Sequence, residues 1–387
     1  MKNKLYFLLL TTILVISLIG LMMVYSASNV GASFKYNDSL YYFKRQFIFC
    51  IIGFIVLWGI TRIDLNIIKN KTTLIFIISL LFLILVLIPG IGSIRGGARS
   101  WIGFGSFSFQ PAEFIKISLT LLICRYLAKY DKELIKIKSF LMLLFIVVLI
   151  FGLIMLQPDF GTGLVIVLSS IALLFISGVP NKYFIGLILV GIIGVIVLIF
   201  SAPYRMERIF AFLDPWQDPL GSGFQGIQSI LAVAPSGLFG LGFNKSIQKH
   251  FFLPEPQNDF IFAIICEELG LIGALIIVFL YFIVFYCSIK ISIRVEDRYK
   301  SYLALGMGLN IFIQAIINIG VVIGLLPITG ITLPLISYGG SSFLITMISL
   351  GIILNISKEC ERWLRQLFYL VVKQWDMLYQ VWQRLKV

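Results

Sequence analysis

The chain has 387 residues and a formal net charge of +13; 59% of its residues are hydrophobic, 13% are charged, and the mean hydropathy is +1.01. This composition excludes a soluble protein, because apolar runs of about 18 or more residues recur and favour a bilayer over water. The runs are continuous and do not alternate with a period of two, so they favour membrane-spanning helices over a β-barrel.

The first predicted element is an apolar stretch from Leu5 to Tyr25, preceded by Lys2 and Lys4. It is longer than the roughly 7–15-residue apolar region of a signal peptide, so we predict a retained span, with cleavage as the alternative. The predicted spans cover residues 5–26, 46–62, 72–90, 111–129, 139–157, 162–179, 183–202, 261–289, 302–326 and 341–357. The fold class is therefore all-α, a polytopic integral membrane protein with about ten transmembrane helices.

Lysine and arginine residues gather in one set of the connecting loops. They lie near residues 62–71, 129–138, 182 and 290–300, and in both terminal segments. This side is predicted to be cytoplasmic, with both termini there, so the positive charge is an anchoring signal and no nucleic-acid partner is expected. The five cysteines fall in spans or near the inner face, which argues against a disulfide framework.

Three loops of note lie on the opposite, outer side, at about 27–45, 91–110 and 203–260. The third, between spans seven and eight, far exceeds the usual connection of about 4–6 residues, and long ordered loops are commonly functional. Its segment SGFQGIQSILAVAPSGLFG is apolar enough to lie in the interface or to re-enter the bilayer. No clear internal repeat is present, which weakens an inverted-repeat transporter.

Two domains are predicted, a transmembrane domain at 1–357 and a tail at 358–387. In the tail, apolar residues recur at helical spacing from Leu364 to Leu385, with polar and charged residues between them. This pattern predicts an amphipathic helix on the inner membrane surface, and a partner-binding helix is the alternative.

Four carboxylates interrupt the apolar segment FFLPEPQNDFIFAIICEELG at 251–270. Asp259 ends the long outer loop, where no ATP or nucleotide sugar is supplied, so an enzyme there needs a substrate that arrives already activated and in the membrane. A lipid-linked pyrophosphate sugar meets both conditions, which makes Asp259 the candidate catalytic residue; a helix N-cap is the alternative. Glu255 is interpreted as a loop carboxylate. Glu267 and Glu268, inside the span, are either functional or partners in a buried salt bridge or helix packing.

Further polar residues gather on the same side. Glu113 and Lys116 share one helical face and can pair, either neutralising each other or lining a polar cavity. Asp159 lies at the turn between spans five and six, as a turn cap or a functional group. Arg205 and Arg208, at the outer end of span seven, either hold a pyrophosphate or extend to lipid headgroups.

The segment ITLPLISYGGSS places Ser337, Gly339 and Gly340 at the outer start of span ten. Exposed amides at a helix start can bind an anion, although the glycines are equally explained by a flexible turn. Gln228 and Ser229, in the segment DPLGSGFQGIQS of the long outer loop, complete the candidate substrate-binding set. The single histidine argues against a His-rich metal site and against a Ser-His-Asp triad.

The chain resembles one family, the shape, elongation, division and sporulation proteins, which are polymerases of the FtsW, RodA and SpoVE type. Its motifs occur in the same order as in that family. The matching stretches are VYSAS at 24–28, FKRQ at 43–46, ARSWIG at 98–103, FQPAEFIK at 109–116, QPDFGTG at 157–163, APYRMERI at 202–209, DPLGSGFQGIQS at 218–229, the whole of 251–270, and GLLPITGITLPLISYGGSS at 324–342. The forms LPEPQNDFIFA and VYSAS are most similar to the SpoVE and FtsW branches.

The resemblance implies a peptidoglycan glycosyltransferase that acts on lipid II and works with a class B penicillin-binding protein. It also implies that Asp259 is essential and that Glu113, Lys116 and Asp159 occupy family motif positions. Two departures are present: Ala112 stands where the family often has serine, and Ser236-Gly237 stands where it often has two glycines. Neither departure touches the proposed catalytic carboxylate.

The hypothesis that follows is an inverting glycosyl transfer. Asp259 deprotonates or orients the 4-hydroxyl of the acceptor sugar, and this oxygen attacks the anomeric carbon of the lipid-linked strand. Undecaprenyl pyrophosphate leaves, stabilised by Arg205, Arg208, Lys116 or a divalent cation, Mg or Mn. No other cofactor is implied.

Two rival functions remain open from the sequence. A lipid II flippase would use the same ionisable groups as a pathway through the membrane. A scaffold that only positions the penicillin-binding protein explains the spans, but gives no reason for acids and bases to gather on the outer face. The expected ligands and partners are lipid II, undecaprenyl-linked glycan, membrane lipids and the transpeptidase. The sequence does not choose between division and spore cortex synthesis.

Overall fold

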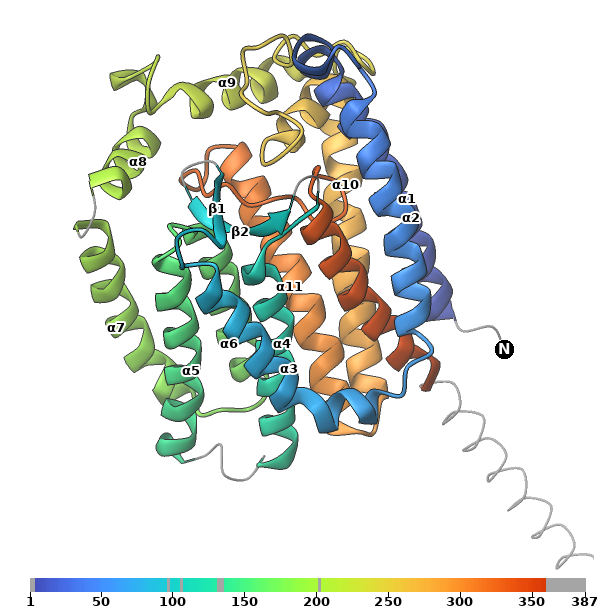
Figure 1. The fold of residues 1–387 in the computed structure, drawn as a ribbon, viewed down its shortest axis with the longest axis vertical. Coiled ribbons are helices and arrows are strands. Elements are labelled where there is room, and N and C mark those ends of the chain that lie inside the picture. The colour runs from blue at the N-terminus through green and yellow to red at the C-terminus, as the bar shows by residue number, and fades with distance from the viewer. Residues whose placement is uncertain (1–3, 96–97, 105–106, 131–135, 201–202, 360–387) are drawn as a thin grey trace, which may run out of the picture.

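The computed structural model describes residues 4–95, 98–104, 107–130, 136–200 and 203–359. Within these residues the protein is a bundle of long helices, with a small sheet and short helices at one end (Figure 1). The amphipathic helix predicted for the tail falls on residues 360–387, which lie outside the described residues.

Among the described residues, ten long helices lie where the spans were predicted. They are α1 (Lys4–Tyr36), α2 (Tyr41–Ile60), α3 (Leu65–Leu85), α4 (Pro111–Lys129), α5 (Ile137–Met155), α6 (Phe160–Ile176), α7 (Asn181–Phe200), α10 (Ile261–Arg294), α11 (Arg298–Val322) and a last helix, Gly340–Glu359. In the described part of the chain, seven of them are long and apolar enough to cross a membrane: α1, α2, α3, α5, α10, α11 and the last helix. The protein is therefore a multi-pass membrane protein, and the count of ten spans stays a prediction.

The first helix is longer than predicted, so the outer loop expected at 27–45 is shorter. α1 continues to Tyr36 and is followed by Asn37, whose φ of 53° is left-handed, and α2 then begins at Tyr41. The sequence at 27–36 contains no proline, so nothing in it breaks the helix before Asn37.

The outer loop between α3 and α4 forms a three-stranded antiparallel sheet that was not predicted. Its strands are β1 (Gly92–Arg95), β2 (Ala98–Phe104) and β3 (Phe107–Phe109), in the order β1-β2-β3. Ile102 lies opposite Gly92 on one side and Phe109 on the other. Glycine and serine weaken the strand signal in this segment, so pairing between neighbouring strands decides its structure.

The long outer segment at 203–260 is built partly from short helices. They are α8 (Pro203–Leu213), η2 (Pro215–Gln217), α9 (Phe224–Val233) and η3 (Ala234–Ser236). α8 follows α7 at the edge of the molecule, whereas α9 packs against α10 (Figure 1). The segment therefore spans one end of the bundle, predicted to be the outer one, from its edge to the helix that follows Asp259.

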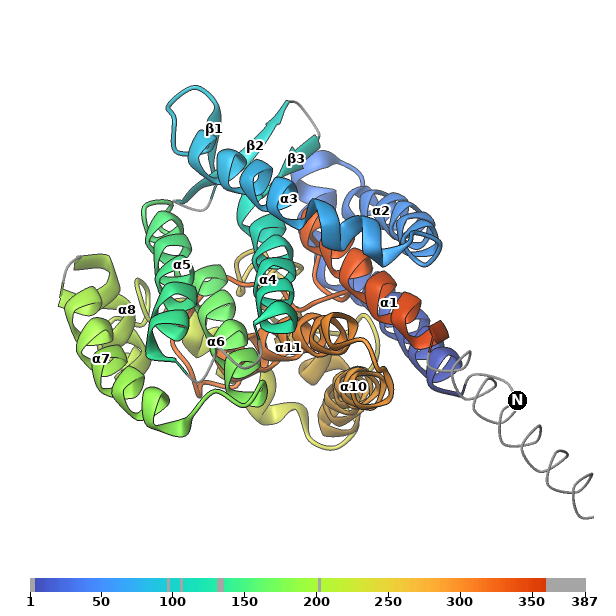
Figure 2. The same ribbon diagram turned by 90° about the horizontal axis from the view of Figure 1, so that it is seen from below.

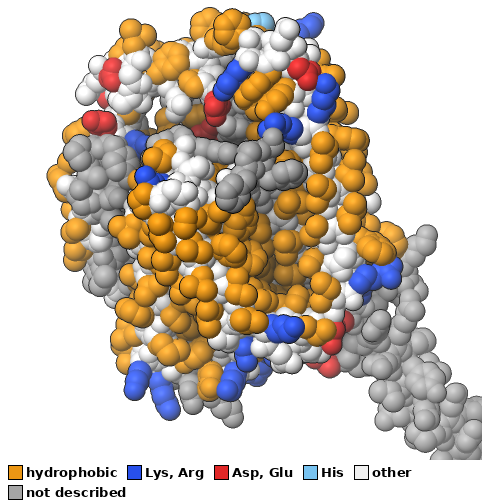
Figure 3. Space-filling model, in the orientation of Figure 1, with side chains coloured by type: hydrophobic (Ala, Val, Ile, Leu, Met, Phe, Trp, Pro, Cys, Tyr) orange, Lys and Arg blue, Asp and Glu red, His pale blue; other side chains and the backbone are white. Residues whose placement is uncertain are grey.

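α11 lies at the centre of the bundle, where it packs against α10, α4 and α6 (Figure 2). Large apolar side chains point outwards on the surrounding helices, among them Ile55 on α2, Phe145 on α5 and Phe279 on α10, each more than 60% exposed. On the face that Figure 3 shows, hydrophobic side chains cover the middle of the molecule, and Lys and Arg side chains lie towards both of its ends. Such a surface is stable against lipid tails and unfavourable in water.

Candidate active site

Asp259 lies at the end of the outer segment, one residue before Phe260, the N-cap residue of α10. The alternative role of Asp259 as the helix N-cap is therefore wrong. Burial raises the pKa of the Asp259 carboxyl to about 6, with Glu255 acting in the same direction and Arg208 and the residue's own amide acting against it. A carboxyl with this pKa is matched to accepting a proton near neutral pH.

Lys116 and Glu113 form a buried ion pair in the first turns of α4. The Lys116 Nζ donates to Glu113 Oε2 at 2.8 Å and to Gln314 Oε1 of α11 at 2.6 Å. The pairing predicted from their spacing is confirmed, and both side chains are only 6% exposed. A buried ammonium with two acceptors is held in one position, which is what a fixed electrostatic contact requires.

Gln314 connects this ion pair to the loop that precedes the last helix. Its Nε2 donates to the main-chain carbonyl of Thr332 at 3.0 Å. The Thr332 hydroxyl in turn donates to the Ser342 hydroxyl at 2.9 Å. A continuous series of hydrogen bonds therefore runs from Lys116 on α4, across α11, to the last helix.

Asp159 is the N-cap residue of α6, as its turn-cap alternative predicted. Its Oδ1 accepts from the amide of Thr162 at 3.1 Å, and its Oδ2 accepts from Gln110 Nε2 at 2.8 Å. Burial raises the pKa of Asp159, and the negative charge of Glu113 adds to this effect, while the hydrogen bonds oppose it. Asp159 thus lies within electrostatic reach of the ion pair on α4, and its substrate-binding role stays a prediction.

Of the two arginines of α8, only Arg208 has a side chain within the described part of the structure. Arg208 is exposed, its Nη1 donates to the carbonyl of Ile328 at 3.2 Å, and its charge acts on the Asp259 carboxyl. This contact brings the long outer segment to the loop before the last helix. The side chain of Arg205 lies outside the part of the chain whose side chains are described.

Ser229 and Gln228 lie on α9. The Ser229 side chain is buried, and its hydroxyl donates to the carbonyl of Val322 at 2.7 Å, at the end of α11. Ser229 therefore ties α9 to α11, and this contact engages the hydroxyl that was expected to meet substrate. Gln228 is half-buried beside it.

The glycine-rich start of the last helix is tightly packed. The Ser337 hydroxyl accepts from the amide of Leu333 at 2.8 Å within a buried turn. The amide of Gly339 donates to Gln46 Oε1 at 3.5 Å. A Cβ on Gly340 would lie 2.4 Å from the ring of Phe49 on α2, so close packing of two helices explains this glycine. Anion binding at these three residues stays a prediction.

The described residues form no evident binding site for the divalent cation, Mg or Mn, that the sequence left possible. Among the described residues, no three His, Cys, Asp or Glu side chains are grouped so that they could hold a metal ion. The carboxylates of Glu113 and Asp159 are already bonded to Lys116, Gln110 and Thr162. The divalent cation therefore stays a prediction from the sequence.

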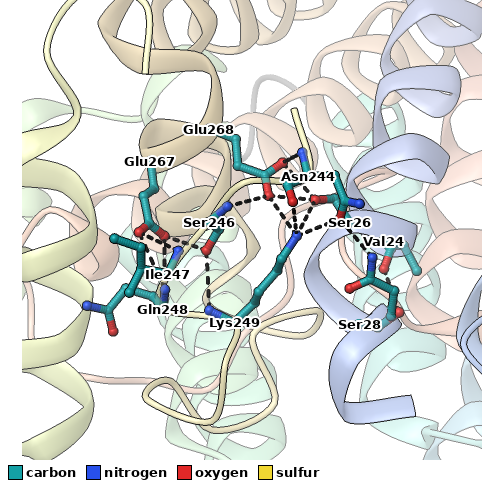
Figure 4. Close-up of polar contacts among 11 residues, drawn as sticks. Val24, Ser26, Ser28, Asn244, Ser246, Ile247, Gln248, Lys249, Glu267 and Glu268 are labelled. Atoms are coloured by element: carbon teal, nitrogen blue, oxygen red, sulfur yellow. Dashed lines mark hydrogen bonds and ion pairs between the residues drawn. The ribbon is translucent and has the colours of Figure 1, made fainter. Parts of the chain in front are cut away.

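The two acids expected inside the eighth span, Glu267 and Glu268, are buried in α10 and face the outer segment at 244–249 (Figure 4). Glu267 accepts from the amide of Ile247 at 2.9 Å and from the hydroxyl of Ser246. A buried carboxylate needs several donors, and here the loop backbone supplies them. The packing alternative is the one that the structure supports for Glu267.

Glu268 joins the outer segment to α1. Its carboxylate accepts from the Ser26 hydroxyl at 2.6 Å and from the amide of Asn244 at 2.9 Å. The Lys249 Nζ lies 3.4 Å from Glu268 Oε1 and donates to the carbonyl of Asn244 at 2.7 Å. We call these four residues and Glu267 the loop anchor, because together they fix the segment that leads to Asp259.

A break in α10 at Gly270 lets the outer segment join the helix. Gly270 has φ 68° and ψ −168°, which is not helical. The amide of Leu271 donates to the carbonyl of Gly237 at 2.9 Å, and the carbonyl of Glu267 accepts from the amide of Leu241 at 2.9 Å. Only glycine suits this position, because its φ is left-handed and the loop backbone passes 2.4 Å from where a Cβ would stand.

Replacing Lys249 with methionine is expected to lower the free energy of unfolding of the outer segment by about 2–3 kcal/mol. The change leaves the buried Glu268 charge without its cation, although the Ser26 hydroxyl and two amides still contact it. Hydrogen exchange of residues 240–250 measures the effect. Lys245→Met, at an exposed position, is the control. Equal exchange in the two variants would show that the anchor adds no stability.

Residues 6–362 match the model of the FtsW/RodA/SpoVE family, described as cell cycle proteins. The chain belongs to this family. The resemblance identified from the motifs is thus confirmed over nearly the whole region expected. The FtsW/RodA/SpoVE assignment also accounts for the multi-pass architecture.

Two curated FtsW/RodA/SpoVE relatives illustrate the similarity. Stage V sporulation protein E of Bacillus subtilis (strain 168) is 47% identical over 352 residues, which cover 91% of this chain and 96% of the relative. The probable peptidoglycan glycosyltransferase FtsW of Coxiella burnetii (strain RSA 493 / Nine Mile phase I) is 40% identical over 347 residues, 89% of this chain and 93% of the relative. The similarity to SpoVE and FtsW proteins is the one expected from the motifs.

Two solved structures share the fold. A chain from a peptidoglycan synthase complex, studied for how polymerization and crosslinking are coordinated, matches with a TM-score of 0.75 and 26% identity, covering 91% of this chain and 97% of that one. The rod shape determining protein RodA of Thermus thermophilus matches with a TM-score of 0.67 and 24% identity, covering 91% and 96%. The predicted all-α membrane fold is confirmed.

Two polar residues of this FtsW/RodA/SpoVE chain, Gln314 and Asn318, were not predicted from the sequence. Gln314 contacts Lys116, and Asn318 donates to the main-chain carbonyl of Asp259 at 2.7 Å. The available signal was the recurrence of amide side chains every four residues inside an apolar span, at 310, 314 and 318. This spacing places all three on one face of α11.

Proposed function

We propose that this protein is a peptidoglycan glycosyltransferase that polymerises lipid II into glycan strands on the outer face of the membrane, in cell division or spore cortex synthesis. The observation that carries the proposal is the Asp259 carboxyl, whose pKa burial raises to about 6, at the end of the long outer segment. The similarity to a probable peptidoglycan glycosyltransferase, 40% identical over 89% of the chain, supports it.

In the proposed reaction, Asp259 takes the proton from the 4-hydroxyl of the acceptor sugar. The oxygen then bonds to the anomeric carbon of the lipid-linked strand, and the bond from that carbon to the pyrophosphate oxygen breaks with inversion. Undecaprenyl pyrophosphate leaves with the electron pair of this bond. Arg208 and Lys116 are the described cations proposed to stabilise the departing charge, and Arg205 belongs to the same proposal.

The proposed orientation places both termini in the cytoplasm and Asp259 outside. It rests on the lysine- and arginine-rich connections at the end of the bundle opposite the Asp259 segment. Residues 1–357 are the proposed catalytic domain, and 358–387 a cytoplasmic amphipathic tail. A class B penicillin-binding protein is the proposed partner, by analogy with the matching chain that comes from a peptidoglycan synthase complex.

The direct test is polymerisation by the purified full chain. The protein is mixed with lipid II and a class B penicillin-binding protein, with no other glycosyltransferase present, and the products are separated by gel electrophoresis. Long glycan strands are expected. Transbilayer movement of lipid II in vesicles, with no polymer formed, would replace the proposal with a flippase.

The polymerisation rate is expected to fall about tenfold for each pH unit below about 6. Asp259 accepts a proton only when it is ionised, and its raised pKa of about 6 means that it becomes protonated as the pH falls through this value. The described charges that act on its carboxyl are Glu255, which raises the pKa, and Arg208, which lowers it. Initial rates from about pH 5 to 8 measure the effect, with thermal unfolding as the control for folding. A flat profile would contradict the role of Asp259 as base.

A further inference from the structure

Three amide side chains lie on one face of α11 and reach different neighbours. Asn310 Nδ2 donates to the Thr120 hydroxyl of α4 at 2.8 Å. Gln314, one turn further, bonds to Lys116 and to the loop before the last helix. Asn318, a further turn towards the outer end, is the only one of the three whose described hydrogen bonds include the residue Asp259.

Asn318 bridges two segments of backbone. Its Nδ2 donates to the carbonyl of Asp259 at 2.7 Å and to the carbonyl of Ile331 at 2.8 Å, and the side chain is only 1% exposed. Both acceptors are carbonyl oxygens, so each of the two N–H groups of the Asn318 side-chain amide has one acceptor. One buried side chain therefore holds together the outer segment and the loop before the last helix.

The position of the Asp259 carboxyl depends on both of these segments. Asp259 precedes the N-cap residue Phe260, so the regular hydrogen bonding of α10 does not set its main chain. Its Oδ2 lies 4.0 Å from where a Cβ would stand on Gly330, the neighbour of Ile331. The amide of Asn318 thus fixes the backbone that carries the carboxyl and the loop against which the carboxyl lies.

We infer that Asn318 is a positioning residue for glycosyl transfer. It holds the Asp259 carboxyl in the position from which the carboxyl can accept the proton of the acceptor hydroxyl. The inference rests on the proposed function. Asn318 is 1% exposed and its amide nitrogen is engaged by two carbonyls, so we place its action on the backbone of Asp259 and not on the substrate. Displacing a reacting group by about 1 Å costs about 100-fold in rate, so losing this bridge acts on the chemical step.

The test is Asn318→Leu in the full chain, with Asn310→Leu as the matched control. The control has the same residue type on the same face of the same helix and is 3% exposed, but its amide contacts Thr120. Polymerisation kinetics and binding of fluorescent lipid II are measured for both. Asn318→Leu is expected to lower kcat about 100-fold with lipid II affinity within about threefold of the unaltered protein. Asn310→Leu is expected to retain kcat within about threefold.

The outcomes separate the two proposals. If the unaltered protein makes no polymer, the proposed function fails whatever the variants do. If it makes polymer, and both asparagine variants lose kcat equally or Asn318→Leu loses only affinity for lipid II, the positioning role is overturned. Should Asn318→Leu not be recovered folded, Asn318→Ala and Asn310→Ala are compared in the same way, because the smaller side chain adds no bulk to the core.

Discussion

Replacing Asp259 with asparagine is expected to reduce lipid II polymerisation by about 10²–10⁴-fold, the range that a general base contributes. Asparagine has nearly the same shape, and the contact from Asn318 is to the main chain of residue 259, so this contact survives the change. The loss therefore reports the missing proton acceptor. Initial rates of polymer formation, at a pH well above 6, measure it.

The control for this substitution is Asp38→Asn. Asp38 is a carboxylate at the turn between α1 and α2, on the side proposed to be outer, and it pairs with Lys44 at an exposed position. Its neutralisation is expected to leave polymerisation unchanged. Lipid II binding and thermal unfolding should be the same for both variants. Polymer formation at the normal rate by Asp259→Asn would refute the assignment of the base.

Replacing Lys116 with methionine is expected to lower the free energy of unfolding by about 3–5 kcal/mol. The change leaves the buried carboxylate of Glu113 without its cation and Gln314 Oε1 without its donor. Removing one partner of a buried pair is costly because the remaining charge cannot be hydrated. Chemical denaturation in detergent micelles measures the loss, and polymerisation should also fall because Lys116 is proposed to stabilise the leaving group.

Lys44→Met is the control that shows how much of the stability loss in Lys116→Met comes from burial of the ion pair. Lys44 and Asp38 are 2.8 Å apart, the same separation as Lys116 and Glu113, but their side chains are 58% and 36% exposed instead of 6%. Water stabilises the charge left on Asp38, so a much smaller loss is expected than in Lys116→Met. Equal losses in Lys44→Met and Lys116→Met would contradict the role of burial.

A double variant separates stability from activity. Glu113→Leu combined with Lys116→Met removes both charges, so much of the stability lost in Lys116→Met should return. A deficit of about 1–3 kcal/mol is expected to remain, because Gln314 Oε1 still lacks its donor. Polymerisation should stay low. Recovery of activity together with stability would mean that Lys116 serves only to neutralise Glu113.

Local patterns predicted much of the fold. Hydropathy over about 20 residues located the helices, since a bilayer-spanning segment must be apolar along its whole length. The pairing of Glu113 with Lys116 was predictable because three-residue spacing on a helix brings side chains together. The sheet at 92–109 and the extension of α1 to Tyr36 were not, since glycine-rich strands and helix ends carry weak local signals.

The candidate site was only partly predictable for a related reason. Ser229 and Ser337 have the hydroxyls that a sugar-binding site needs, and the fold also uses these in contacts with Val322 and Leu333, which their residue types did not predict. Asn318 has an ordinary amide, and its importance arises from a carbonyl 59 positions away. Residue type states what a side chain can donate or accept, whereas the partner that it meets is a property of the packing.

By itself the sequence determined that this protein crosses the membrane many times, which polar groups its spans carry, and that Asp259 stands where the outer segment meets α10. These follow from composition and spacing along a single helix, which are local properties. The tertiary structure alone decided that Asn318 holds the backbone of Asp259 and that Glu268 meets Ser26, 242 positions away. Such contacts form only when helices that are distant in the chain pack together. The packing decides which hydrogen-bond partner lies within reach of a buried polar group.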